Sequence, residues 1–301
     1  MRLPTTTTEW QNYIAHIRER SEIDTLKTHE EAVGMIGTLL EKTILEQADQ
    51  ALDQGAIGLL FSGGIDSTLI GFILKKNARP FTAVSIGFQD NPGQKLPEDI
   101  LAARDTSEKL GFEYIEEICN FERIEELFKE TASILGPELV NAVNIGVGSV
   151  EAEAIKQLKK ENPGITHIFT GLGSEEIFAG YKRHADSENV HAECWNGLDK
   201  MFRRDLLREL ALTRHFNVTA LAPFLDEDVI EKAMTIPAKW KLSERGSKLI
   251  LREAAKQLGL EVSFSQRPKK AAQYGSRTHH ALTKLSRKHG HAYIKDYLAT
   301  L

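Results

Sequence analysis

Short apolar runs alternate with amphipathic stretches through the middle of the chain, and this alternation limits the folds that the chain can adopt. The runs are rich in Ile, Leu, Val and Phe, and they cover residues 57–61, 82–86, 112–118 and 165–170. Amphipathic stretches separate them near 67–77, 98–110 and 121–161. Strands of this length with helices between them form βαβ units around a parallel sheet buried on both faces. We therefore predict an α/β fold with a doubly wound parallel sheet.

The two ends of the chain look different from this middle part. Residues 9 to about 54 carry apolar side chains at the three-to-four spacing of helices. After Gly180 the pattern is again mostly helical, with Pro and Gly residues as stops. We predict three parts: an N-terminal helical segment (1–50), an α/β core (51–185) and a helical C-terminal region with a basic tail (186–301).

Composition limits the compartment and the kinds of site. No stretch has the roughly 18–20 apolar residues of a membrane helix, and residues 1–5 lack the apolar region of a secretory signal. Cys119 and Cys194 lie far apart in the sequence and form no CxxC pair. A zinc or iron–sulfur site on these cysteines is therefore not expected. We expect a cytoplasmic protein with no membrane partner.

The C-terminal tail is basic although the whole chain has a net charge of −5. From Arg267 to the end there are eight Lys or Arg residues and one acid, Asp296. Such a tail can bind nucleic acid or supply positive charge to a phosphate site. The alternative is a basic helix that lies on the acidic body of the protein.

The segment Ser62-Gly63-Gly64-Ile65-Asp66-Ser67 joins a predicted buried strand to a predicted apolar helix. Two adjacent glycines let the backbone turn sharply and bring its N–H groups against an oxygen-rich ligand, and the two serines add hydroxyl donors. The helix directs its positive N-terminal end at the same place. Since Asp66 would repel a phosphate, it indicates a Mg²⁺ ion between them. The alternative is a simple turn in which Asp66 caps the helix.

These residues carry a resemblance to a known family. SGGIDS resembles the pyrophosphate-binding loop of the ATP-pyrophosphatase superfamily, and GLGSEEIFAGY at 171–181 resembles the GxGSDExFxGY signature of the synthetase domain of asparagine synthetase. Segments at 97–99, 222–226, 248–252 and 267–269 agree in the same order. The chain is most similar to stand-alone asparagine-synthetase-domain-containing proteins that lack the glutaminase domain.

The resemblance implies that the chain binds ATP and Mg²⁺ and transfers AMP to a substrate oxygen with release of pyrophosphate. The nucleotide would be held by Ser62, Gly63, Gly64, Asp66, Ser67, Ile86, Gly171 and Lys269, with Ile86 beside the adenine. Lys269 would act as a catalytic residue near the leaving pyrophosphate, where a cation stabilises charge in the transition state. Lys270 takes this role if the register shifts by one residue.

The same resemblance gives Asp66 and Glu175 a shared role. With the strand order 3-2-1-4, the loops after strands one and four meet at the switch point of the sheet. Asp66 and Glu175 would face each other there as catalytic residues and as ligands of one Mg²⁺. The family has Asp where Glu175 stands. The alternative for Glu175 and Glu176 is stabilisation of the first helical turn by about 0.3–1 kcal/mol.

Three positions depart from the family. Arg2 stands where the glutaminase nucleophile, a cysteine, follows the initiator methionine, so no glutamine hydrolysis by that route is expected. Leu172 replaces the acidic residue that is assigned to the aspartate substrate and to proton transfer, and a leucine can do neither. Thr219-Ala220-Leu221 lacks the arginine that is common before the PFLD turn. Adenylation is therefore better supported than asparagine formation.

We predict an ATP-dependent amidoligase, a carbon–nitrogen ligase that activates a carboxylate as an acyl-adenylate and passes it to ammonia or an amine. Its partners would be a small carboxylate substrate, the nitrogen donor and a separate glutaminase subunit, and a homodimer is compatible with the sequence. Two alternatives stay open: an RNA-modifying enzyme that adenylates a base carbonyl, and a non-catalytic nucleotide-binding scaffold. Nucleic acid is not the favoured partner.

Overall fold

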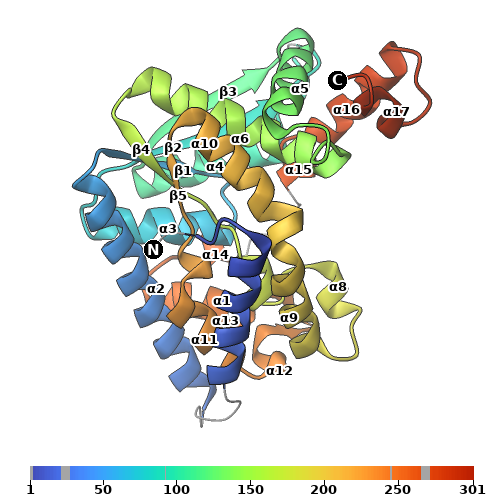
Figure 1. The fold of residues 1–301 in the computed structure, drawn as a ribbon. Coiled ribbons are helices and arrows are strands. Elements are labelled where there is room, and N and C mark those ends of the chain that lie inside the picture. Colours follow the sequence, from blue (N-terminus) through green and yellow to red (C-terminus); the bar gives the residue numbers. More distant parts are fainter. Residues whose placement is uncertain (1–2, 22–27, 92, 245, 266–271) are drawn as a thin grey trace.

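The computed structural model describes residues 3–21, 28–91, 93–244, 246–265 and 272–301. Its centre is a five-stranded parallel sheet with the strand order β3-β2-β1-β4-β5 (Figure 1). The strands are β1 (Ala56–Leu60), β2 (Thr82–Phe88), β3 (Glu113–Cys119), β4 (Ile165–Phe169) and β5 (Thr219–Leu221). The predicted α/β fold and the predicted order 3-2-1-4 are confirmed. The fifth strand was not predicted, because its three residues are too short to show a periodic pattern.

Helices cover both faces of this sheet and enclose two hydrophobic cores. One core includes Leu59 of β1 and Leu69 of α3 (Ile65–Lys76), and it reaches α4 (Glu98–Leu110) through Ala103. The other includes Val84 of β2 together with side chains of α5 (Phe121–Leu135) and α6 (Ala142–Glu161). Both faces of the sheet are thus buried, as expected for parallel strands joined by helices.

Two long stretches that we predicted to be helical each form two helices in the structure. Capping residues mark where these helices begin. The N-terminal stretch forms α1 (Thr7–Arg20) and α2 (His29–Leu52), and each begins with a capping box, Thr6 with Glu9 and Thr28 with Glu31. The stretch 121–161 forms α5 and α6, which begin after Asn120 and Asn141. These side chains accept hydrogen bonds from otherwise unpaired N–H groups and so fix where each helix starts.

After β4, the strands among the described residues are β5 and a short hairpin of two two-residue strands, β6 (Leu242–Ser243) and β7 (Gly246–Ser247). After β4 come α7 (Ser174–Ile177), α8 (Lys182–Ala185), α9 (Val190–Met201), the π-helix η1 (Phe202–Leu206) and α10 (Leu207–Phe216). After β5 follow the 3₁₀ turn η2 (Pro223–Leu225), α11 (Glu227–Thr235), α12 (Ala238–Lys241), α13 (Leu249–Gln257) and α14 (Val262–Ser265). The chain ends with α15 (Ala272–Gly275), α16 (Thr278–Lys288) and α17 (Ile294–Leu298). None of the described helices combines the length and the hydropathy that crossing a bilayer requires.

The N-terminal helices pack on the second half of the chain, beside α11 and α13 (Figure 1). Trp10 is fully buried, and its indole N–H donates to the Leu198 carbonyl at 2.8 Å. The Tyr13 hydroxyl donates to the Leu225 carbonyl, also at 2.8 Å. The Tyr13 hydrogen bond therefore connects helix α1 to the end of η2, which lies next to the loop after β4.

Replacing Tyr13 by Phe is expected to lower the free energy of unfolding by about 1 kcal/mol, the net contribution of one neutral hydrogen bond. Urea unfolding measures the change. Tyr293→Phe is the matched control, because the Tyr293 side chain is exposed and the change should leave the stability unaltered. Equal stabilities for both variants would show that the Tyr13 bond contributes nothing.

Candidate functional site

The loops after β1 and β4 lie side by side, because these two strands are neighbours in the sheet. The phosphate loop runs from Phe61 to Gly64 and leads into α3, and the second loop runs from Thr170 to Gly173 and leads into α7. A Cβ atom on Gly171 would lie 3.0 Å from the Cβ of Asp66, so the two loops touch. The structure thus places both predicted loops at the carboxyl end of the sheet.

The predicted residues Asp66 and Glu175 come together around the ammonium group of Lys248. Lys248 Nζ lies 2.9 and 2.8 Å from the two carboxylate oxygens of Asp66 and 2.8 Å from Glu175 Oε1. It also donates to Ser174 Oγ at 2.9 Å, and this hydroxyl donates to Asp66 Oδ1. We call these four residues, Asp66, Ser174, Glu175 and Lys248, the carboxylate–lysine cluster.

Lys248 lies in the segment 248–252 that resembles the family, but its part in the site is not predicted from the sequence. It precedes α13 with a left-handed backbone (φ 56°) and is only 3% exposed. Burial alone would favour the neutral amine, but the charges of Asp66 and Glu175 outweigh it and raise the pKa of Lys248 above its ordinary value. The lysine is therefore a fixed positive charge at the switch point of the sheet.

The predicted phosphate loop turns sharply in front of the N-terminus of α3. Gly63 has a φ of 64°, and a Cβ there would lie 2.8 Å from the Ala102 carbonyl carbon, so a glycine is needed both for the turn and for its contact with α4. The Ser67 hydroxyl accepts from the Ser62 N–H at 3.3 Å, which joins the start of the loop to α3. Gly64 is the N-cap of α3, so the positive end of that helix faces the loop.

The chemistry of the cluster fits a magnesium nucleotide. Asp66, Glu175 and the Ser174 hydroxyl supply oxygen atoms, which Mg²⁺ prefers, and Mg²⁺ at phosphates commonly takes only one or two protein carboxylates. Within the part of the chain that the structure describes, no group of three or more His, Cys, Asp or Glu side chains could hold a metal alone. Lys248 already bridges both carboxylates, so a metal would share them with an ammonium group.

Other predicted residues lie in different surroundings. Ile86 is buried in the second hydrophobic core, on the strand that ends at Phe88. The Phe88 N–H donates to the Ser276 carbonyl at 2.9 Å, so this backbone donor is engaged by the segment between α15 and α16. Lys269 and Lys270 lie outside the described residues, and their predicted role stays a prediction.

Leu172 occupies the position of the family's acidic residue. It is partly buried and packs against the first hydrophobic core. Because its side chain has no charge and no hydrogen-bonding atom, the loop between Gly171 and Gly173 presents an apolar group where the family has a carboxylate.

The part of the basic tail that the structure describes, from Ala272 on, contacts acidic side chains of the body. Lys284 and His280 of α16 pair with Asp90, and Lys288 and His289 pair with Glu125 of α5. Burial alone would raise the pKa of Glu125, but its bonds to Lys129, Lys288 and His289 lower it to about 2. This arrangement agrees with the interpretation of the tail as a basic helix on an acidic body.

Comparisons with known proteins place the chain in a family. The sequence model of the Asparagine synthase family matches residues 39–195 and 184–297. The chain is 27% identical over 302 residues to "Putative asparagine synthetase (glutamine-hydrolyzing) 1" of Methanocaldococcus jannaschii, covering 88% of this chain and 53% of that protein. It is 28% identical over 226 residues to the glutamine-hydrolyzing asparagine synthetase of Homo sapiens, covering 71% of this chain and 39% of the human protein. The chain thus spans about half the length of these relatives or less.

Solved structures resemble the chain more loosely. The NMN synthetase of Francisella tularensis aligns with a TM-score of 0.34 and 14% identity over 84% of this chain and 95% of that one. The NAD⁺ synthetase of Burkholderia pseudomallei gives a TM-score of 0.32 and 13% identity over 96% and 99%. The family match itself covers most of the sequence and includes both loops and the lysine between them. The chain therefore belongs to the asparagine synthase family.

Proposed function

We propose that the chain is an ATP-dependent amidoligase. A substrate carboxylate attacks the α-phosphorus of ATP, the bond to the bridging oxygen breaks, and pyrophosphate leaves. An amine or ammonia then attacks the acyl carbon and displaces AMP. The observation that carries this proposal is the carboxylate–lysine cluster, which joins the phosphate loop to the loop after β4.

Each part of the cluster has a place in this reaction. The backbone of the phosphate loop and the N-terminus of α3 would bind the β- and γ-phosphates. The ammonium of Lys248 lies within 2.9 Å of side-chain oxygen atoms in the first turns of α3 and α7, directly after both loops, so it would face negative charge that develops on the departing pyrophosphate. Preorganised cations of this kind lower the barrier because they need no reorientation during the reaction.

Magnesium would bind at the oxygens of Asp66 and Glu175 together with the phosphates. When bound, it would neutralise phosphate charge and act as a Lewis acid. Asp66 is 5% exposed and is held by Lys248 and Ser174. The carboxylate is therefore already oriented before any ligand enters.

The acceptor is proposed to be a carboxylate other than aspartate, or one whose amino group is bound elsewhere. Leu172 offers no charge to an ammonium group, and burying an ammonium against an apolar side chain is costly. We also propose that the nitrogen donor is ammonia or an amine that arrives as the neutral base. A pyrophosphate-release assay with Mg²⁺-ATP across simple and N-acylated carboxylic acids would identify the acceptor.

Replacing Asp66 by Asn is expected to weaken Mg²⁺-ATP binding by about tenfold or more, because one charged metal ligand becomes a neutral amide. Calorimetry with and without Mg²⁺ measures this change. Asp53→Asn, at the exposed end of α2, is the matched control and should bind like the wild type. If the wild type shows no magnesium-dependent heat, or if Asp66→Asn keeps it in full, the proposed function fails.

A further inference from the structure

Helix α7 presents two adjacent carboxylates to two different clusters. Glu175 points to Lys248, as described above, while Glu176 is 1% exposed and lies among arginines from α8 and η1. Arg204 Nη2 donates to Glu176 Oε1, and Arg183 Nη2 lies 3.7 Å from the same oxygen. Burial raises the pKa of Glu176 to about 7, although Arg204 opposes this shift.

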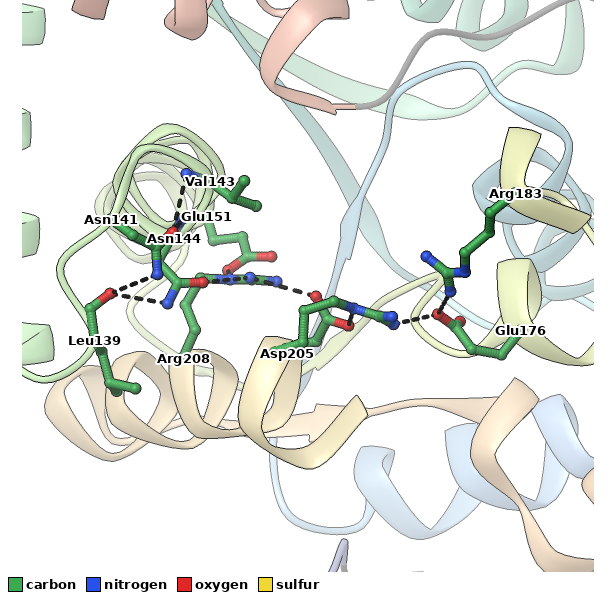
Figure 2. A network of polar contacts seen from close by, with 10 residues as sticks. Leu139, Asn141, Val143, Asn144, Glu151, Glu176, Arg183, Asp205 and Arg208 are labelled. Carbon is green, nitrogen blue, oxygen red and sulfur yellow. Dashed lines mark hydrogen bonds and ion pairs between the residues drawn. The ribbon is translucent and has the colours of Figure 1, made fainter. Parts of the chain in front are cut away.

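A chain of polar contacts holds Arg204 in place, and Figure 2 labels its members Glu176, Asp205, Arg208 and Glu151. Arg204 Nε donates to Asp205 Oδ2 at 2.6 Å, and Asp205 Oδ1 lies 3.6 Å from Arg208 Nη1. Arg208 is 3% exposed, and it bonds Glu151 and Asn144 of α6 at 3.2 Å each. These contacts connect α7 to α6, which covers the sheet.

The backbone of η1 explains how this short segment contacts both Glu176 and Arg208. Residues Phe202–Leu206 form a π-helix between α9 and α10. A π-turn contains one more residue than an α-turn, and such turns are frequent at functional sites. The π-turn allows Arg204 to contact Glu176 on one side, while the next residue, Asp205, lies near Arg208 on the other. Arg203 stays exposed.

Stability alone does not account for this arrangement. Replacing buried ion pairs by apolar side chains often leaves proteins equally or more stable, so such pairs are weak evidence for stabilisation. Helix α7 has only four residues, which is too short to hold its own shape in water. Its position must therefore be set by contacts with its neighbours, and Arg204 contacts it on the side away from Lys248.

We propose that Arg204 is a positioning residue for the carboxylate–lysine cluster. Through Glu176 it holds α7 in place, and this fixes Ser174 and Glu175 against Lys248 and Asp66. The consequence for nucleotide binding rests on the proposed function, whereas the consequence for the order of α7 does not. The two can therefore be measured separately.

The test compares Arg204→Met with Arg203→Met, which removes the same type of charge from the exposed side of the same π-turn. Amide hydrogen exchange is followed in peptides covering 171–181 and in β1 and β2. We expect exchange in 171–181 to become about tenfold faster or more in Arg204→Met, with the strands unchanged, and Arg203→Met to match the wild type. If both variants exchange alike in 171–181, the proposal is overturned.

A double-mutant cycle separates positioning from a general loss of structure. Glu176→Gln removes the charge that Arg204 pairs with, so Arg204→Met should add little to it, and the effects on exchange and on Mg²⁺-ATP affinity should be strongly non-additive. Arg204→Lys keeps one charged donor and should restore part of the wild-type behaviour. Additive effects, or no restoration by lysine, would contradict the proposal. If the wild type binds no ATP, the proposed function is wrong. The hydrogen-exchange result alone then decides whether Arg204 is a positioning residue.

Discussion

Replacing Lys248 by Met is expected to slow ATP-dependent pyrophosphate release strongly and to destabilise the protein at the same time. The side chain is nearly fully buried between two carboxylates. Methionine keeps most of the volume but removes the ammonium group that lies between Asp66 and Glu175. Removing one partner of a buried ion pair costs about 3–5 kcal/mol of stability, and loss of a preorganised catalytic charge typically lowers the rate by about 10²–10³-fold.

Urea unfolding and a coupled pyrophosphate assay measure the two effects. Lys256→Met on the same helix is the matched control, because that side chain is exposed, and it should change neither quantity. Lys248→Arg covers the case in which the methionine variant does not fold. Arginine restores the charge but not the compact ammonium geometry, so we expect a folded protein with reduced turnover. A stable, active Lys248→Met protein would refute the assignment of the cluster.

Whether a feature could be predicted from the sequence depends on how far apart in the chain its residues lie. The phosphate loop is a local feature: a buried strand, two glycines and a helix lie within a dozen residues, and their pattern predicts the turn directly. The pairing of Lys248 with Asp66 joins residues 182 positions apart. Periodicity cannot reveal such a contact, and only a lysine directly before the apolar residues Leu249, Ile250 and Leu251 hinted that the amine is buried.

The same reasoning explains why the contacts of Glu176 were not predicted. Its place in the first turn of a predicted helix suggested stabilisation by the helix dipole, which is a local argument. The structure instead surrounds it with Arg204 and Arg183, and the π-helix that aims Arg204 at it has no sequence signature that periodicity detects. Strand β5 was missed because three residues carry too little pattern. The fold followed from repeated local signals, whereas the second half of the site depends on long-range packing.

Ionisation of Glu209 is expected to make the stability of the protein depend on pH. Replacing this glutamate by glutamine is expected to remove that dependence. The side chain is buried next to Glu151, Asp205 and Arg208, and its Oε2 atom has no hydrogen-bond partner among the described residues. Burial, together with the charge of Glu151, raises the pKa of Glu209 to about 8. The unfolded chain would have the ordinary glutamate pKa of about 4.3.

The sign of the effect follows from these two values. Because the folded state holds the proton more tightly, the stabilisation is fully present below about pH 4.3 and is lost as the pH rises through 8. Glu209→Gln mimics the protonated form at every pH. We therefore expect the stability advantage of the variant over the wild type to grow with pH, by about 4 kcal/mol between pH 5 and pH 9.

Urea unfolding at several pH values between 5 and 9 tests this expectation. Glu161→Gln, at the exposed end of α6, is the matched control and should follow the wild-type curve throughout. If Glu209→Gln instead runs parallel to the wild type, Glu209 is already ionised at neutral pH, and its charge must be balanced by Arg208. In that case Arg208, which is buried, and Arg204, which is partly buried, would have to neutralise all the carboxylates around them. The pH dependence therefore decides whether the contacts that hold Arg204 in place form a fully ionised network or one that retains a proton.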